Sequence, residues 1–444
     1  MTNHLLRSTL LPLFALGLLT LPAHADETRL PQAESLTERQ FMAAPDDRGA
    51  RPGLSGPRLA DPAVLERLRR NDLRNPGLPR HLTTWERRQQ VTTPFRLPAP
   101  EDIPDYRFLR PQAEYERNDA ILMRWGTFNA VLTSMIVPIT TGDSRARVKL
   151  IVSGPVQQAS AANTLSSAGA NLNRVDFLQA PSNSVWIRDY GPRFASADFR
   201  PIIIDHDYDR PRPQDNQVPS QVAGALNLPI YALPLAQGGG NYHSFANGEA
   251  FITDHILREN PGVSKTQMKQ LFAAYQGVDL TFFGTLSVDP NGNTGGGFSS
   301  WYDGTGHLDM WFLPVDDDTV IIGQYSPSEW NGIPHQVTEE AVSVMQARGY
   351  EVIRTPGWRA SNTHFTYTNA VIVNDIVLIC AFNGYSTQNA QALSAFEQAF
   401  PGRTIIPVDC SDIIASSGAL HCIVKHKPAS DAFGPRPPYY GWNF

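Results

Sequence analysis

The part of the chain that follows Tyr106 consists of short apolar segments separated by turns, and this pattern restricts the fold more than any other feature of the sequence. Such segments suit strands and are too short for helices. Three longer stretches with helical periodicity are interspersed with them. The alternation predicts a mixed α/β domain with repeated small sheets. We expect strands at 120–125, 148–152, 202–204, 250–253, 310–313, 320–323, 370–373, 376–379 and 404–407, and helices at 264–275, 338–348 and 386–400.

The N-terminus is typical of a secretory signal peptide over residues 1–25. Arg7 supplies a positive charge, an apolar run extends from Leu10 to Leu21, and Ala23-His24-Ala25 forms a small-x-small cleavage site. A membrane anchor is the alternative, but the run is shorter than the roughly 20 residues that span a bilayer. We therefore expect a cleaved signal and a soluble exported protein, either periplasmic or secreted from the cell.

Residues 26–105 are rich in charge and proline and show no recurring strand pattern. Short helices are expected near 61–73 and 83–90. We interpret this part as an N-terminal extension that packs partly on the domain or stays mobile, and we do not expect it to carry the chemistry. Residues 106–444 are expected to form one catalytic domain, for which the hydrophobic content of 41% over 444 residues supplies an ample core.

The charge balance gives no reason to expect a nucleic-acid or membrane partner. The formal net charge is −6, which is modest for a chain of this length. A cationic substrate would not be repelled.

The chain has three cysteines, too few for a disulfide-rich scaffold. Cys380 and Cys410 could pair in an oxidising compartment and leave Cys422 as the odd thiol. However, Cys380 lies in the apolar run 376–380, where a small buried residue is the simpler interpretation.

Three motifs supply the parts needed to attack a guanidinium carbon. They are WIRDYGP at 186–192, GHLD at 306–309 and SGALHC at 417–422. The carboxylates of Asp189 and Asp309 can grip a planar guanidinium through paired hydrogen bonds. Cys422 can act as the nucleophile and His307 as the proton donor.

Each motif also has a structural interpretation when it is viewed alone. Cys422 lies in the strand-like stretch LHCIV, where a cysteine is often only a packing residue. His307 could be a histidine of a turn and strand that Asp309 holds for structural reasons. The two residues are two positions apart, so an extended segment would place both side chains on one face. A zinc site is not expected, because H-x-D with one cysteine is too sparse a ligand set.

An aromatic residue and a glycine run complete the candidate site. Trp186 precedes Asp189 and could form a wall against which the face of a guanidinium packs. Gly238-Gly239-Gly240-Asn241 indicates unusual backbone geometry but is weak evidence for function.

In combination, these motifs resemble the agmatine deiminase family, which includes the Porphyromonas-type peptidylarginine deiminases among the guanidino-group-modifying enzymes. The resemblance starts at RPQAEYE (110–116), continues through WIRDYGP, GGGN and GHLD, ends at LHC, and covers about three quarters of the chain. It implies a five-fold pseudosymmetric α/β propeller of the pentein type, with the active site in its central cavity.

The resemblance also assigns roles to matching positions. It implies that Cys422 is the nucleophile, His307 the general acid and base, Asp189 and Asp309 the guanidinium clamp, and Trp186 a wall of the pocket. Asn369 matches an active-site asparagine, with Asn362 as the fallback. Neither a cofactor nor calcium is implied.

Substrate choice depends on the segment DHDYDRPRP at 205–213. It is similar to a Tyr-x-Arg-Pro-Arg-Pro segment of the secreted peptidylarginine deiminases, and this implies that Arg210 and Arg212 recognise the carboxylate of a C-terminal arginine. The alternative is a solvated surface turn. The sequence thus favours an exported hydrolase that converts peptidyl arginine to citrulline and ammonia. An agmatine deiminase that forms N-carbamoylputrescine and an arginine-binding protein without turnover are the two alternatives.

Overall fold

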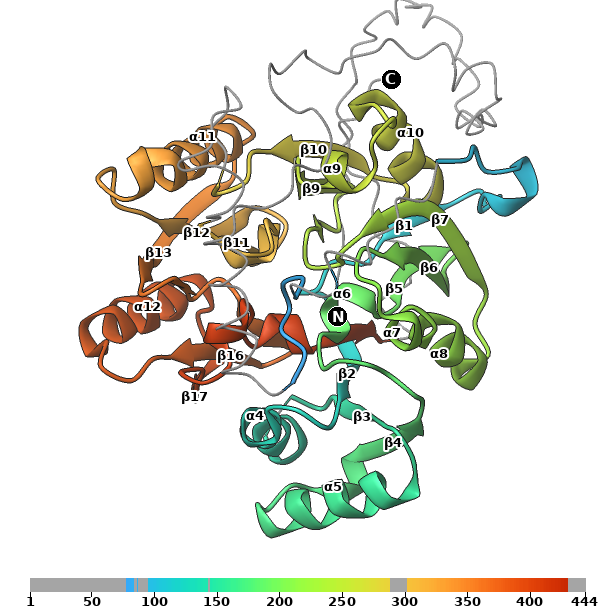
Figure 1. The fold of residues 1–444 in the computed structure, drawn as a ribbon, viewed down its shortest axis with the longest axis vertical. Coiled ribbons are helices and arrows are strands. Elements are labelled where there is room, and N and C mark those ends of the chain that lie inside the picture. Colours follow the sequence, from blue (N-terminus) through green and yellow to red (C-terminus); the bar gives the residue numbers. More distant parts are fainter. Residues whose placement is uncertain (1–76, 84–85, 87–94, 143, 288–301, 430–444) are drawn as a thin grey trace, which may run out of the picture. The chain divides into compact units, whose positions relative to one another are not determined.

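The computed structural model describes residues 77–83, 86, 95–142, 144–287 and 302–429, all of which belong to one compact unit (Figure 1). The expected signal peptide and the helix expected at 61–73 lie outside the described residues, as does most of the helix expected at 83–90.

Five small sheets form the framework of the described part of the chain. Their strand orders are β1-β5-β6-β7, β10-β9-β8, β11-β12-β13-β14, β15-β16-β17 and β18-β2-β3-β4. The strands are β1 (Leu109–Pro111), β2 (Asn118–Arg124), β3 (Arg147–Val152), β4 (Val175–Gln179), β5 (Arg193–Ala197), β6 (Arg200–Tyr208), β7 (Ile230–Gln237), β8 (His243–Ser244), β9 (Glu249–Thr253), β10 (Asp279–Phe283), β11 (Phe312–Pro314), β12 (Thr319–Gln324), β13 (Glu351–Ala360), β14 (Thr363–Thr366), β15 (Val371–Val373), β16 (Ile376–Ala381), β17 (Thr404–Asp409) and β18 (Lys425–Pro428).

Each sheet contains a parallel strand pair whose connection includes a helix. β2 and β3 are joined through α4 (Asn129–Thr141), β3 and β4 through α5 (Pro155–Ser167), and β6 and β7 through α7 (Pro213–Asn216) and α8 (Val218–Leu226). β9 and β10 are joined through α9 (Ile256–Glu259) and α10 (Lys265–Gln276), β12 and β13 through α11 (Ile333–Ala347), and β16 and β17 through α12 (Ser386–Ala399). Parallel strands need such crossovers, because a tight turn cannot return the chain to the same end of the sheet.

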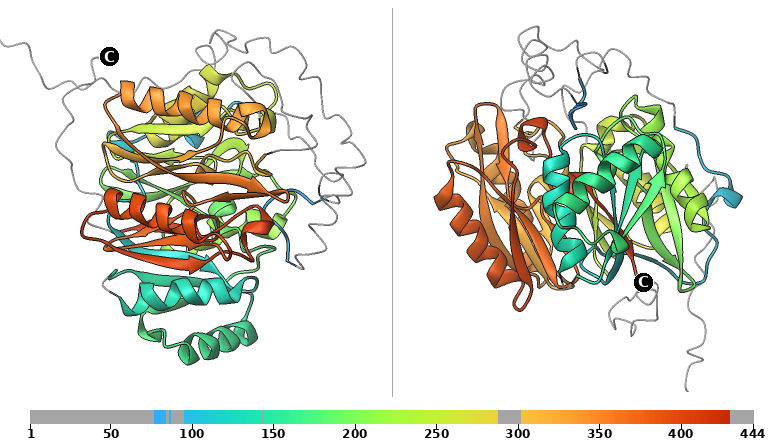
Figure 2. Two further views of the ribbon diagram at one scale, coloured as in Figure 1. Left: turned by 90° about the vertical axis from the view of Figure 1, so that its left-hand side faces the viewer. Right: turned by 90° about the horizontal axis from the view of Figure 1, so that it is seen from below.

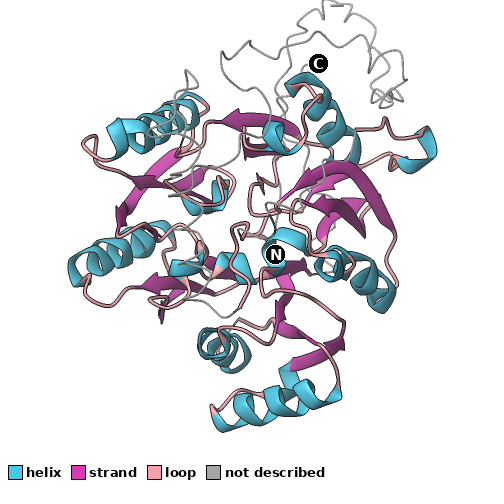
Figure 3. Cartoon of the chain, viewed as in Figure 1, coloured by secondary structure: helices cyan, strands magenta, loops and turns pink. Residues whose placement is uncertain are grey.

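The longer helices of these connections lie outward of the strands (Figures 1 and 2). Buried apolar residues of the helices and of the strands belong to common core clusters. Figure 3 shows the same arrangement coloured by secondary structure, and loops meet in the middle of the molecule, between the sheets. No helix among the described residues is long and apolar enough to cross a membrane.

The predicted mixed α/β architecture is confirmed, and the predicted strands are present with small shifts of their ends. The segment predicted at 310–313 is the exception, because Met310 ends a 3₁₀ helix, η3 (Leu308–Met310), and the strand β11 begins at Phe312. The three predicted helices correspond to α10, α11 and α12. Helix α4 was not predicted, since it is rich in β-branched residues and contains Pro138, features that disfavour a helix when the sequence is read locally.

Cys380 and Cys410 form a disulfide, so the interpretation of Cys380 as an unpaired packing residue is wrong. Cys380 lies on β16 and Cys410 directly follows the neighbouring strand β17, and their Cα atoms are 5.4 Å apart. Parallel pairing brings these two positions together although 30 residues separate them in the sequence. Cys422 is therefore the one free cysteine among the three of the chain.

Candidate active site

The predicted catalytic residues come together from short helical turns and connecting segments. Asp189 lies on the one-turn helix α6 (Ile187–Tyr190), His307 directly precedes η3, and Asp309 lies on η3. Cys422 lies on a second 3₁₀ helix, η6 (His421–Ile423), which precedes β18. The expectation of an extended segment at His307 to Asp309, and of a strand at Cys422, is wrong. The tighter helical turns still direct all four side chains to one place.

An arginine of this chain, Arg80, fills the place where these side chains meet. Its Nε and Nη2 donate hydrogen bonds of 2.8 Å each to the two carboxylate oxygens of Asp189. Its Nη1 and Nη2 donate to the two carboxylate oxygens of Asp309 at 3.1 and 3.0 Å. Two carboxylates thus grip one guanidinium in paired fashion, which is the arrangement that suits a planar fork of five N–H donors.

Cys422 and His307, the predicted nucleophile and the predicted proton carrier, face the two terminal nitrogens of the same guanidinium. Nη1 of Arg80 lies 2.7 Å from Sγ of Cys422, and Nη2 lies 2.7 Å from Nδ1 of His307. None of these side chains is exposed to solvent. Because Nδ1 accepts from an N–H group of Arg80, the imidazole is neutral with its proton on Nε2, which has no hydrogen-bond partner.

Charge pairing offsets the cost of burial at the clamp. Burial disfavours every charged form here, but the guanidinium of Arg80 holds the pKa of Asp189 well below its ordinary value and lowers the pKa of Asp309 as well. Burial also opposes the charge on Arg80, yet the two carboxylates keep its pKa well above the ordinary value. The guanidinium is thus bound as a cation, and both aspartates are anions.

Burial is not offset in this way at Cys422 and His307, the two groups that are predicted to exchange protons. Burial raises the pKa of the Cys422 thiol well above its ordinary value, although the cation of Arg80 opposes this rise. Burial and the charge of Arg80 lower the pKa of His307. The thiolate therefore depends on a neighbouring cation, and a bound guanidinium is the cation in contact with the sulfur.

Asn369 lies in the site, as predicted, two residues before the start of β15. Its Oδ1 accepts from the backbone N–H of His421 at 3.0 Å and lies 3.2 Å from Sγ of Cys422. Its Nδ2 donates to the backbone carbonyl of Asp309 at 3.3 Å. Asn369 thus ties η6 to η3 and fixes the position of the sulfur. Asn362 lies instead in an exposed position at the turn between β13 and β14, where it accepts from the partly buried Arg359.

A buried polar chain behind the clamp was not predicted. Nδ1 of His421 lies 2.9 Å from a carboxylate oxygen of Asp309, and its Nε2 lies 2.7 Å from Glu114. Glu114 also pairs with Arg188, the neighbour of Asp189, and the pKa of Glu114 lies well below its ordinary value because Arg188 and His421 outweigh the effect of burial. These contacts of His421 and Glu114 hold the carboxylate of Asp309 in place.

The glycine run has a steric role that its sequence left open. A Cβ atom on Gly240 would lie 1.9 Å from Nη2 of Arg80, 2.7 Å from Oδ2 of Asp309 and 2.9 Å from Oδ1 of Asp189. A Cβ atom on Gly238 would lie 2.3 Å from the ring of His307. Glycine at these positions keeps the guanidinium site open.

The residues predicted to bind substrate contact the backbone at Arg80 and at the two residues before it. The indole N–H of Trp186 donates to the carbonyl of Leu78 at 2.7 Å, so the tryptophan holds the peptide backbone; its role as a wall of the pocket stays a prediction. Nε of Arg210 donates to the carbonyl of Arg80 at 3.1 Å. Nη2 of Arg212 donates to the carbonyl of Pro79 at 2.7 Å. Both arginines are buried, so the alternative of a solvated surface turn is wrong.

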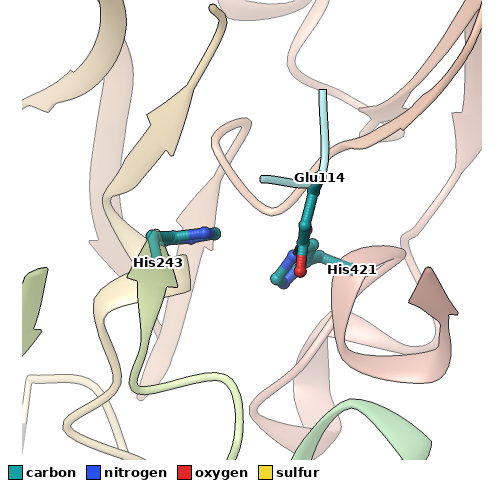
Figure 4. A group of neighbouring side chains, drawn as sticks. All are labelled: Glu114, His243 and His421. Carbon is teal, nitrogen blue, oxygen red and sulfur yellow. Dashed lines mark hydrogen bonds and ion pairs between the residues drawn. The ribbon is translucent and has the colours of Figure 1, made fainter. Parts of the chain in front are cut away.

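Two groups of side chains near the site have the composition of metal ligands. The first is Glu114, His243 and His421, in which Glu114 points at His421 and the His243 ring is directed toward the pair (Figure 4). The carboxylate of Glu114 is already paired with Arg188, a cation that a metal ion would have to displace. The second group is Asp209, His255 and Glu259, and Arg210 pairs with Asp209 there. We assign no metal to either group.

Three residues with contacts in the site, Arg80, Glu114 and His421, were not predicted from the sequence. Arg80 lies in a segment whose composition indicated only an extension, and no local pattern marks it. Glu114 lies within the motif RPQAEYE, and His421 directly precedes the nucleophile. For Glu114 and His421, the position within these motifs was the signal that could have identified them.

Comparison with known proteins places these residues in a family context. The family model described as Porphyromonas-type peptidyl-arginine deiminase matches residues 110–428, which include every predicted site residue. A protein of Streptomyces coelicolor, provisionally named agmatine deiminase, is 26% identical over 302 residues, which cover 63% of this chain and 84% of that protein.

Solved structures support the fold. The C. jejuni agmatine deiminase with substrate bound has a TM-score of 0.60 at 16% identity, over 72% of this chain and 96% of that chain. The agmatine deiminase of Enterococcus faecalis has a TM-score of 0.58 at 18% identity, with the same two coverages. At these identities the likeness establishes the mixed α/β fold that this chain shares with the pentein-type enzymes.

Proposed function

We propose, because this chain belongs to the Porphyromonas-type peptidyl-arginine deiminase family, that it converts peptidyl arginine to citrulline and ammonia and prefers arginine at a peptide C-terminus. The family acts on the C–N bonds of guanidino groups, and deimination of that type is the activity of this chain. The observation that carries the proposal is the guanidinium of Arg80, held between two carboxylates with a thiol at one terminal nitrogen and an imidazole at the other.

Binding comes first in the proposed reaction. The substrate guanidinium takes the place of the Arg80 guanidinium between Asp189 and Asp309. Its positive charge lies against the sulfur of Cys422 and favours the thiolate, which is the reactive form. The site thus makes its nucleophile reactive when a cationic substrate is present.

Two covalent steps follow. Nδ1 of His307 first takes the thiol proton of Cys422, and the resulting thiolate adds to the central guanidinium carbon. The imidazolium then delivers this proton from Nδ1 to the terminal nitrogen that it contacts, and the bond from carbon to that nitrogen breaks to release ammonia. A thiouronium joins the sulfur to the remaining substrate. One water then adds to the same carbon, gives its proton to His307 and displaces the sulfur, so that citrulline leaves and the thiol is restored.

The preference for a peptide C-terminus is supported by the position of two arginines. Arg210 already holds the backbone carbonyl of Arg80, at the point where one oxygen of a terminal carboxylate would lie. Arg212 holds the carboxylate of Glu86 through Nε at 2.6 Å and Nη2 at 3.1 Å. A substrate carboxylate could replace that of Glu86, since a guanidinium fork suits any planar carboxylate.

Agmatine is the second candidate substrate. Relatives and solved neighbours carry the name agmatine deiminase, and one of those structures holds its substrate, which favours a small guanidine as ligand of this site. Agmatine has no carboxylate, so Arg210 and Arg212 would then lack an anionic partner on the ligand. The product would be N-carbamoylputrescine.

Export of the protein and a five-fold pseudosymmetric propeller are also part of the proposal. The disulfide of Cys380 and Cys410 supports export, because such bonds persist in oxidising compartments. The repetition of a parallel pair with a helical crossover in each of the five described sheets supports the propeller.

Comparison of two substrates tests the proposed function. Ammonia release is measured with a short peptide that ends in arginine and with agmatine, over a range of concentrations. A higher kcat/KM for the peptide supports the peptidyl-arginine proposal, whereas a higher value for agmatine moves the assignment to agmatine deimination. Absence of ammonia from both would favour a binding protein without turnover.

A further inference from the structure

The N-terminal extension enters the active site, in contrast to the expectation that it takes no part in the chemistry. Residues 77–83 are drawn in blue near the middle of the sheets in Figure 1. They precede the part of the chain that matches the family model, which starts at residue 110. The segment therefore lies outside the part of the chain that the family model matches.

Contacts on both sides of Arg80 hold this segment as a peptide. The backbone N–H of Arg80 donates to the carbonyl of Ser416 at 3.0 Å, and its carbonyl accepts from Arg210. The carbonyls of Leu78 and Pro79 accept from Trp186 and Arg212, on the N-terminal side of Arg80.

The C-terminal side of Arg80 is anchored as well. The imidazole of His81 lies 3.0 Å from the hydroxyl of Ser417, a residue of the motif that contains the nucleophile. Glu86 forms a buried ion pair with Arg212. Burial alone would raise the pKa of Glu86, but Arg212 holds it below the ordinary value. The site therefore accommodates a chain that continues beyond the arginine in both directions.

We infer that residues 78–83, together with Glu86, are a built-in occupant of the peptide-substrate site, in which Arg80 takes the place of a substrate arginine and Glu86 takes the place of a substrate carboxylate. External substrate must displace this segment before it can reach Cys422. The inference rests on the proposed function for the identity of the substrate. It adds that an arginine within a peptide is bound by the same site and that the chain regulates its own access.

Because the segment is covalently joined to the catalytic domain, it occupies the site even when its contacts are weak. A segment joined to the catalytic unit acts at an effective concentration on the order of 1 mM. A contact that would give a free peptide a Kd of ~0.1 mM then keeps the site about nine-tenths occupied. The apparent KM for an external substrate would be about tenfold higher than that of the open site.

Cys422 provides a readout of occupancy that does not depend on turnover. It is the one free thiol of the chain, and it is buried beneath Arg80. The experiment measures the rate of alkylation of Cys422 by iodoacetamide in the full chain, in Arg80→Ala and in Arg96→Ala. Arg96 is an exposed arginine of the same extension and serves as the matched control.

The inference predicts that Arg80→Ala is alkylated at least about tenfold faster than the full chain and has a KM about tenfold lower for a peptide that ends in arginine. Arg96→Ala should behave as the unaltered chain in both measurements. Equal alkylation rates and equal KM values for the unaltered chain and Arg80→Ala would overturn the inference. Rapid alkylation of Arg80→Ala without ammonia release from any arginine compound would support the built-in occupant and reject the proposed function.

A separate peptide added to the protein tests whether the guanidinium of Arg80 holds residues 77–83 in the site. The peptide Gly-Leu-Pro-Arg-His-Leu-Thr, which reproduces residues 77–83, should slow the alkylation of Arg80→Ala, whereas the same peptide with citrulline in place of arginine should not. Equal protection by both peptides would overturn the role of the guanidinium. If Arg80→Ala does not fold, Arg80→Lys keeps one positive charge but loses the paired hydrogen bonds, and its alkylation rate should lie above that of the unaltered chain.

Discussion

Gly240→Ala is the substitution for which the structure gives the most direct estimate of loss. The backbone N–H of Gly240 donates to Asp189 at 3.1 Å, and its carbonyl accepts from the N–H of Asp309 at 3.1 Å, so the glycine lies between the two halves of the clamp. A methyl group here would lie 1.9 Å from the guanidinium nitrogen, where ordinary contact begins at 3.4 Å. The guanidinium would have to retreat by about 1.5 Å, and a displacement of about 1 Å at a reacting centre costs roughly a hundredfold in rate.

We expect Gly240→Ala to lower kcat/KM by at least about a hundredfold, which corresponds to ~3 kcal/mol of transition-state stabilisation. The assay is ammonia release from a peptide that ends in arginine, with thermal unfolding as the check on folding. Gly224→Ala is the matched control, because Gly224 is exposed on α8 and a Cβ atom there meets nothing within 4 Å. A folded Gly240→Ala protein with kcat/KM within about threefold of the original would refute the steric reasoning.

Three further predictions concern charge, ionisation and the disulfide. Asp189→Asn should lower kcat/KM by at least about a hundredfold, since the amide places N–H donors against those of the guanidinium; near-normal kinetics in a folded variant would make Asp189 structural. Because the pKa of Cys422 is raised, the alkylation rate of this thiol in the full chain should keep rising with pH between about pH 7 and pH 10, and a plateau below about pH 8 would contradict this. Cys380→Ala should lower the free energy of unfolding by about 2–4 kcal/mol and leave kcat nearly unchanged, as urea unfolding and ammonia release would measure; a large loss of kcat would place the disulfide in the mechanism.

The sequence indicated the catalytic side chains because their chemistry is carried by residue type. A thiol, an imidazole and two carboxylates in a fixed order are recognisable without coordinates, and Asp189, His307, Asp309 and Cys422 indeed meet at one guanidinium. Their local conformation was less accessible. Tertiary contacts hold His307, Asp309 and Cys422 in or beside short 3₁₀ turns, where the local pattern suggested extended chain.

Arg80 could not be predicted, because nothing in a local pattern tells a solvated arginine from one that enters a site 109 residues further along the chain. The disulfide of Cys380 and Cys410 was named as a possibility and left undecided for a similar reason. Whether Cys380 and Cys410 pair depends on the distance between neighbouring strands, which only the parallel register of β16 and β17 sets.

The most direct test of the account is ammonia release by the unaltered chain and by Cys422→Ala with the same arginine peptide, measured also in the Arg80→Ala background so that occupancy of the site by the extension does not decide the result. The account predicts citrulline and ammonia in equal amounts from the chains that keep Cys422, and neither product from the chains that lack it. Ammonia release at an undiminished rate after Cys422→Ala would contradict attack by this thiol on the guanidinium carbon.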